Sequence, residues 1–356
     1  MMLMSGSRRG LTILAAFALA STVASAADWK VELDAGWKAY QEGQLDEAER
    51  RLKLAEKEAR AFGENDPRLA TTLDHLAWVL SSEGRAAEAL PLAKSALAIR
   101  EKAAVGKPAE MIESLNTLAS IYDLAGLPAQ ARPIYARCLE AAESTLGPEH
   151  PSVAATLDNL ATVDHVLGDG EKAEAEYKKA LAIREKLNGA ESIDLAATLH
   201  NLGTLYTDQE KYAAAEPILK RALALREKAL GPDHPDVASS LEALGWLYTN
   251  QKKPAEAEPL LKKALDLYAV DLGDNHPHVA VCSSKLGRTC LMQDHKAEAV
   301  NCCKRAVGIY ESLKSDPEGL ATALDDYAAA LRKAGDEAEA GKAEAQAKAL
   351  RQTLRK

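Results

Sequence analysis

Leucines recur every 42 residues along the middle of the chain, at Leu73, Leu115, Leu157, Leu199 and Leu241. Whole segments travel with them, so that residues 199–206 match residues 241–248 and 115–122. A fixed period of this length is typical of tandem units that stack and bury one another's apolar faces. The sequence therefore predicts a repeat array instead of one globular core.

Small residues mark where the two helices of each unit should cross, because close approach requires a nearly absent side chain. On the first helix they are Ala77, Ala119, Ala161, Gly203, Gly245 and Gly287. On the second helix they include Ala89, Ala131, Ala173, Ala215, Ala257 and Ala299. This pattern resembles the tetratricopeptide repeat family, and the lengthened period resembles its kinesin light chain type. The resemblance implies an all-α, right-handed superhelical solenoid over residues 28–356.

Six regular repeats span residues 67–314, and degenerate ones extend both ends, so we expect eight repeats and sixteen helices. The additional length lies in Leu-Gly-Pro-Asp/Glu-His-Pro segments between repeats. Their glycine should end a helix in a left-handed conformation, and their last proline suits the first turn of the next helix. The recurring His150, His234 and His276 precede these prolines. We therefore expect them to serve helix entry and not metal binding.

Four prolines fall on the predicted second helices, two residues after the first small residue: Pro91, Pro133, Pro217 and Pro259. Proline deep in a helix costs about 3 kcal/mol. Either each helix begins late enough to hold the proline in its first turn, or each helix carries a shallow kink.

Residues 1–26 break the repeat pattern. Arg8 and Arg9 precede an apolar run at 11–20, and Ala24-Ser25-Ala26 follows it. These are the three parts of a secretory signal peptide, with an uncleaved membrane anchor or a disordered end as the alternatives. The paired arginines also weakly resemble a twin-arginine signal, which leaves the export route open. We expect a periplasmic or secreted protein with no stable membrane insertion after cleavage.

Charge argues against nucleic acid as a partner. The predicted signal holds two of the 44 basic residues and none of the 53 acidic ones, which leaves the remainder at a formal charge of −11. Such a surface repels phosphate backbones. The chain also lacks the HExxH, GxSxG and paired-glycine nucleotide motifs, and residues 335–342 do not form a Walker loop. We predict a non-catalytic protein with no cofactor and no metal.

Four of the five cysteines lie in the sixth repeat. Cys290 stands where other repeats carry tyrosine, and Cys303 stands where they carry leucine, so both should point between the two helices. In an oxidising compartment these two could form a disulfide. The alternative is that they are small core residues with free thiols. The fifth, Cys138, occupies a small-residue place and is expected to be buried.

The first helices should line a concave groove. Positions adjoining the small residue give the predicted peptide-binding set: Asp74, Trp78, Asn116, Asp158, Asn159, His200, Asn201, Thr204, Glu242 and Trp246. In peptide-binding relatives, asparagines at these places hold the ligand backbone, and Asn116, Asn159 and Asn201 match them. The carboxylate-gripping basic residues of chaperone-binding relatives are absent from the first five repeats. The set therefore favours a neutral or basic segment.

These observations favour an exported scaffold that binds a protein or peptide segment in its groove. Two alternatives remain open. One is a structural assembly subunit that acts through its convex face or its ends, and the other is an accessory subunit that regulates a neighbouring enzyme. The sequence does not identify the partner.

Overall fold

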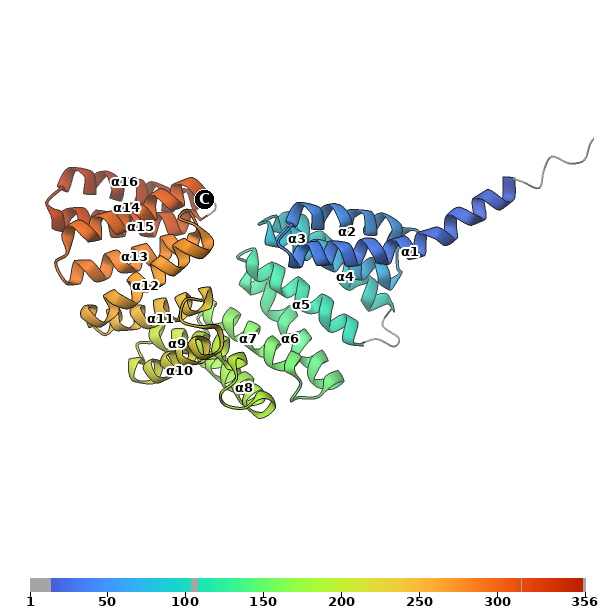
Figure 1. Ribbon diagram of the computed structural model, residues 1–356, viewed down its shortest axis with the longest axis horizontal. Helices are drawn as coiled ribbons and strands as arrows, with labels where there is room; N and C mark the ends of the chain where they lie inside the picture. The colour runs from blue at the N-terminus through green and yellow to red at the C-terminus, as the bar shows by residue number, and fades with distance from the viewer. Residues whose placement is uncertain (1–13, 104–107, 315, 355–356) are drawn as a thin grey trace, which may run out of the picture. The chain divides into compact units, whose positions relative to one another are not determined.

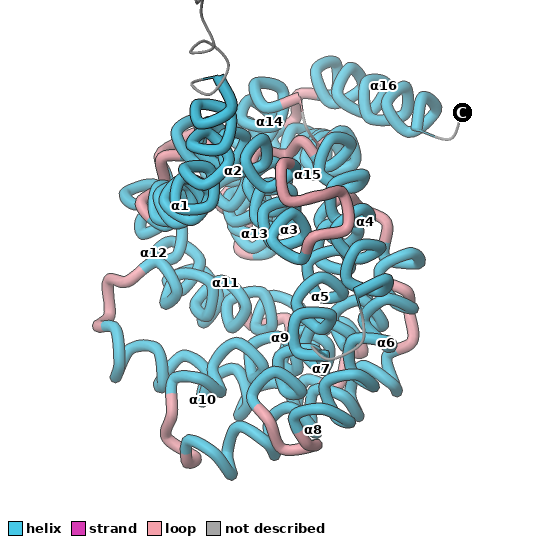
Figure 2. Tube along the Cα trace, turned by 90° about the vertical axis from the view of Figure 1, so that its right-hand side faces the viewer, coloured by secondary structure: helices cyan, strands magenta, loops and turns pink. Residues whose placement is uncertain are grey.

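A computed structural model describes residues 14–103, 108–314 and 316–354, and this part of the chain is helical with no β-strand (Figures 1 and 2). It contains sixteen α-helices and one short 3-10 turn, η1 (Ile193–Leu195). The helices are α1 (Leu14–Gln41), α2 (Leu45–Arg60), α3 (Pro67–Ser82), α4 (Ala86–Ala103), α5 (Pro108–Leu124), α6 (Pro128–Leu146), α7 (Pro151–Val166), α8 (Gly170–Asn188), α9 (Ala196–Asp208), α10 (Tyr212–Leu230), α11 (Pro235–Asn250), α12 (Pro254–Leu272), α13 (Pro277–Met292), α14 (Lys296–Leu313), α15 (Pro317–Ala334) and α16 (Glu337–Leu354).

Consecutive helices pair, and the second helix of a pair also packs on the first helix of the next pair. The second helices α4, α6, α8, α10, α12 and α14 begin 42 residues apart. The all-α class and the expected sixteen helices are confirmed within the described residues. Successive first helices also touch, as α9 with α11 and α13 with α15, so they form one layer of each unit.

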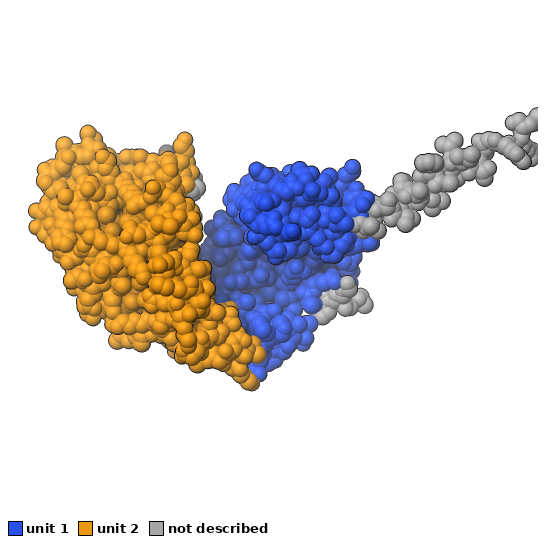
Figure 3. Space-filling view, viewed as in Figure 1, with its two compact units in different colours: residues 1–176 blue, residues 177–356 orange. Residues whose placement is uncertain are grey.

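The array divides into two compact units, residues 1–176 and 177–356, with the boundary inside α8 (Figure 3). The sequence predicts one continuous solenoid, whose period does not mark this division. Each unit is described separately below.

The inter-repeat turns combine a glycine with a capping histidine. Gly147 and Gly231 have φ of 89° and ψ of 155° and 161°. The positive φ is as expected, but the ψ values place both in an extended region open mainly to glycine and not in the left-handed helical one. Nδ1 of His150, His234 and His276 accepts the backbone N–H two residues on, at 3.1–3.2 Å. The following proline is the first helical residue, so the predicted helix-entry role is confirmed.

The four prolines lie inside their helices, each as the sixth residue. The late-start alternative is therefore wrong. All four side chains are exposed, so the carbonyl that loses its N–H donor lies toward solvent. Water can hydrogen-bond that carbonyl, which lowers the cost of the missing bond.

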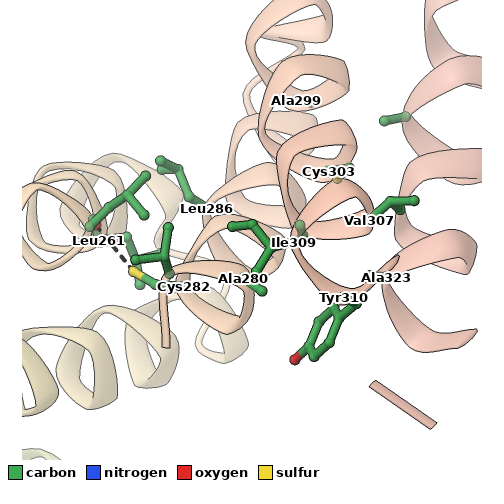
Figure 4. Packing of buried hydrophobic residues seen from close by; sticks show 14 of the residues in the cluster. Leu261, Ala280, Cys282, Leu286, Ala299, Cys303, Val307, Ile309, Tyr310 and Ala323 are labelled. Atoms are coloured by element: carbon green, nitrogen blue, oxygen red, sulfur yellow. Dashed lines mark hydrogen bonds between the residues drawn. The ribbon is translucent and has the colours of Figure 1, made fainter. Parts of the chain in front are cut away.

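Close helix crossing governs the core of unit 2. Gly203 and Gly245 lie against Leu219 and Leu261, and an added Cβ would come within 3 Å of either leucine. In the sixth repeat Cys303 takes the leucine's place against Gly287. Figure 4 shows Cys303 among the buried side chains of this core, with Leu286, Ala299 and Val307 nearby.

Of the predicted signal segment, residues 1–13 lie outside the described structure and residues 14–26 belong to α1, with side chains described only from residue 28 on. Among the helices that the structure describes, none is long and apolar enough to span a membrane.

Candidate binding groove

Two adjoining cavities lie along the first helices of unit 2, and we call them together the unit 2 groove. The first, of about 310 Å³, is lined by His200, Thr204, Thr207, Ser239, Glu242, Ala243, Trp246, Tyr268, His278, Val281 and Lys285. The second, of about 400 Å³, is lined by Trp246, Val281, Ser284, Lys285, Arg288, Tyr310, Asp316, Glu318, Gly319, Thr322, Ala323 and Asp326. Trp246, Val281 and Lys285 belong to both, so the cavities are continuous along α11 and α13.

A buried carboxylate organises the first cavity. Glu242 is 7% exposed, accepts the Tyr268 hydroxyl at 2.9 Å and pairs with Lys285 Nζ at 2.7 Å. Burial and the nearby Glu242 carboxylate raise the pKa of Tyr268 well above its usual range, so the hydroxyl keeps its proton and remains the donor. The predicted acid Glu242 therefore lies at this cavity, but it is already paired with Lys285.

His200 supplies an uncharged imidazole to the same cavity. Burial, with a smaller contribution from Arg226, lowers the pKa of His200 to about 4. Its Nδ1 is buried without a hydrogen-bond partner in the described structure. Thr204 on the next turn donates to the His200 carbonyl at 3.0 Å. At neutral pH this side of the cavity is therefore polar but neutral.

Trp246 lies between the two cavities. Arg288 stands over its ring at 4.8 Å and Lys285 at 5.6 Å from the centroid. The predicted set includes this ring as a ligand contact, whereas the structure covers it with two cations of its own chain.

Carboxylates outnumber basic groups in the second cavity. Arg288 approaches Asp326 at 3.6 Å, and Ser284 Oγ donates to Asp326 at 2.7 Å. Burial raises the pKa of Asp326 despite these contacts. Asp316 and Glu318 add two more acids. Across the whole groove, four carboxylates face two basic side chains, which favours a ligand without net negative charge.

In unit 1, the predicted groove acid Asp74 belongs to a buried cluster instead. It is 2% exposed, with Arg100 Nη2 at 3.3 Å and Ser114 Oγ at 2.6 Å from Oδ2. Burial outweighs the attraction of Arg100 and raises the pKa of Asp74 to about 7. Asp158 is also buried. Asp74 thus packs between repeats, and both acids are buried away from a ligand.

The predicted asparagines lie half-buried. Asn159 Nδ2 donates to Asn116 Oδ1 at 3.4 Å, so these two form a row on α5 and α7. Asn201 on α9 makes no side-chain hydrogen bond to the described residues. Trp78 is engaged, because its Nε1 donates to the Tyr40 hydroxyl at 2.7 Å.

Tyr268 and His278 line the groove but were not predicted, since they do not occupy the positions next to the small residue from which the groove set was chosen. Tyr268 comes from a second helix, and its 42-residue counterpart is Arg226. Arg226 donates to the Asp236 carbonyl ten residues on, at 3.1 Å, as Arg184 does to the Asp194 carbonyl at 2.8 Å. The signal was this recurring arginine and its replacement by tyrosine in the fifth repeat.

The predicted Cys290–Cys303 bond is not formed in the structure, where all five cysteines are free thiols. Both side chains are fully buried, as the alternative of small core residues expects. Burial raises the pKa of Cys290 to about 12, and it raises that of Cys303 further. These thiols are therefore poor nucleophiles in the folded chain.

Comparison with protein families matches a tetratricopeptide repeat model to residues 38–102, 110–186, 159–228, 194–269 and 248–312. The chain therefore belongs to the tetratricopeptide repeat family. Proteins of this repeat class act as protein-interaction scaffolds. None of the curated proteins compared with the chain matches it.

Among solved structures, BtubC (BKLC) from P. vanneervenii is 27% identical, with a TM-score of 0.56 over 64% of this chain and 92% of that one. A putative kinesin light chain from Podospora anserina, with nearly identical TPR-like repeats, is 24% identical, with a TM-score of 0.51 over 58% of this chain and 97% of that one. A Rap protein complexed with competence and sporulation factor is 17% identical, with a TM-score of 0.51 over 88% and 76%. The first two likenesses support the kinesin light chain-type repeat, and the third shows the fold alone.

Proposed function

We propose that this chain is an exported, non-catalytic scaffold that binds a neutral or basic protein segment in the unit 2 groove. The observation that carries the proposal is the pair of continuous cavities that share Trp246. Segment-sized grooves lined by aromatic and polar side chains are the usual binding surfaces of repeat proteins. The solved complex of a Rap protein supports this use of the fold.

The charge of the groove supports the ligand class. Its carboxylates outnumber its cations by four to two, so an acidic segment would meet repulsion. The neutral His200 imidazole, whose Nδ1 has no hydrogen-bond partner in the described structure, can exchange hydrogen bonds with an extended backbone. Because Trp246 already carries two cations, the segment would contact the exposed part of its ring and not stack upon its face.

A photo-crosslinker placed at Thr204, inside the first cavity, tests the groove directly. Val270, 88% exposed on α12, offers the matched control position. We expect Thr204 to crosslink to one region of a partner, mapped by mass spectrometry, and Val270 to give no such product. Crosslinks only from Val270 or from the terminal repeats would instead indicate an assembly subunit or an enzyme regulator.

Export is tested separately by cell fractionation and N-terminal sequencing. The three-part N-terminus leads us to expect a mature chain outside the cytoplasm that begins near Ala27. A soluble cytoplasmic chain that retains residues 1–26 would contradict export and leave the groove proposal intact.

A further inference from the structure

Four potential metal ligands meet where the fifth and sixth repeats join. Glu258 extends from α12, Cys290 from α13, His295 from the turn after α13, and Glu298 from α14. Each offers a ligand atom, and these atoms all lie within 4.8 Å of one another. His295 Nδ1 lies 3.3 Å from the Glu258 carboxylate. The cluster is separate from the unit 2 groove, since none of the four residues lines it.

The preceding repeat shows the same place built without this donor set. Its counterparts, 42 residues earlier, are Glu216, Tyr248, Lys253 and Glu256. There the Tyr248 hydroxyl donates to Glu216 at 3.2 Å, and Lys253 lies over the tyrosine ring. The acids are thus common to both repeats. Cysteine and histidine replace tyrosine and lysine only in the sixth, and both replacements introduce metal ligands.

The Cys290 thiol and the His295 imidazole make no hydrogen bond to the backbone of the described residues. Cys138 and Cys282 donate to backbone carbonyls at 3.5 and 3.4 Å. Cys290 is fully buried, and its sulfur has no hydrogen-bond partner among the described residues. His295 directly precedes α14, and its side chain makes no capping bond, because Nδ1 faces the Glu258 carboxylate instead. The thiol is therefore unused by the fold, and the imidazole is held only by another member of the cluster.

Lys262 now neutralises the two acids, with Nζ at 2.7 Å from both Glu258 and Glu298. Its side chain is 44% exposed, so it can rotate into solvent. A lysine in this position shows that the carboxylates already hold one cation, and it would compete with any other.

We propose that Glu258, Cys290, His295 and Glu298 form a zinc site. One sulfur, one imidazole nitrogen and two carboxylate oxygens are a donor set that Zn²⁺ accepts in tetrahedral geometry. Ligands at about 2.0–2.3 Å from zinc lie roughly 3.5 Å apart, so the cluster must contract slightly. Binding releases the Cys290 proton to solvent and displaces the Lys262 ammonium. The ion would join α12, α13 and α14 and so stiffen the contact between two repeats.

Calorimetric titration of the full chain with ZnCl₂ under reducing conditions tests the site. We expect one equivalent to bind, and both Cys290→Ala and His295→Ala to weaken binding by roughly 10-fold or more. The controls Cys302→Ala, a neighbouring thiol outside the cluster, and Glu256→Gln, the preceding repeat's counterpart of Glu298, should bind like the parent. Lys262→Gln should bind more tightly, because the competing cation is gone.

Co²⁺ in place of Zn²⁺ adds a readout of the sulfur ligand. A thiolate-to-cobalt charge-transfer band should appear in the parent and vanish in Cys290→Ala. His295 is 49% exposed, so its variant keeps the test valid if the Cys290 variant does not fold. The proposal is overturned if no equivalent binds, if the two ligand variants bind as tightly as the controls, or if the cobalt spectrum lacks the thiolate band.

Discussion

Replacing Gly203 by alanine tests the close helix crossing on which the repeat depends. The added Cβ would lie 2.5 Å from Leu219 Cδ2 and 2.6 Å from Leu219 Cγ. Leu219 is 1% exposed, so it has little room to move. Overpacking costs about 1–3 kcal/mol, whereas alanine gains about 1 kcal/mol over glycine in a helix. We expect a net loss of about 1 kcal/mol in the free energy of unfolding.

Gly308 provides the matched control in the same unit. It lies exposed within α14, and an added Cβ would meet no heavy atom within 4 Å. Gly308→Ala should therefore stabilise by up to about 1 kcal/mol. Urea unfolding followed by far-UV circular dichroism measures both variants, and the m-value shows whether the comparison holds.

Whether Gly203→Ala lowers or raises the free energy of unfolding tests the close helix crossing. In a Leu219→Ala background, which resembles the Ala77 and Ala93 pair of the first regular repeat, Gly203→Ala should become stabilising. If Gly203→Ala alone stabilises as much as Gly308→Ala does, the crossing is not tight and the packing argument is refuted.

Three further predictions concern buried and half-buried ionisable groups. The pKa of Asp74 is raised to about 7, above the ~3.9 of an unfolded chain, so the free energy of unfolding should fall as pH rises from about 4 to 7. Asp74→Asn should flatten this pH dependence of the urea unfolding midpoint. An unchanged slope would count against burial of Asp74 as the cause. The His276 cap needs an unprotonated Nδ1 and burial lowers the pKa of His276, so its contribution of about 1 kcal/mol should be present above pH ~6.5 and lost as pH falls further. His276→Asn should keep the cap and lose this acid sensitivity in thermal melts, and equal sensitivity would argue against the cap. Alkylation of Cys290 and of Cys302, whose pKa burial raises to about 11, should be slow in the folded chain; thiol counting after unfolding without reductant should give five, and fewer would favour the disulfide.

Most of the fold can be predicted from the 42-residue period and from the residues of the turns. A 42-residue spacing fixes where each helix begins, and His234 with Pro235 marks a helix start that can be recognised from two residues. Local chemistry decides these features, so the sequence suffices. The prolines were ambiguous because the pattern does not show that Pro217 faces solvent inside its helix.

The site was harder to predict because it depends on neighbouring repeats. Asp74 and Glu242 each stand three residues before the small residue of their repeat, so the sequence pattern treats them alike. Arg100 buries the first in a cluster, whereas Tyr268 and Lys285 hold the second at a cavity wall. Those partners come from other helices, so the position of the acid within its own repeat does not reveal them. The same reason hid the Cys290 cluster, whose ligands come from three helices and a turn.

Calorimetry with the partner segment that the crosslinking experiment identifies tests binding in the unit 2 groove most directly. The parent, Trp246→Ala, His200→Ala and the exposed control Val270→Ala are titrated with a synthetic neutral or basic segment. We expect Trp246→Ala to weaken binding about 10-fold or more and His200→Ala by about 1 kcal/mol. Val270→Ala should bind like the parent, and higher salt should weaken binding if the groove carboxylates attract the segment. Equal affinity for all four proteins, with their helicity and melting intact, would contradict binding in the unit 2 groove.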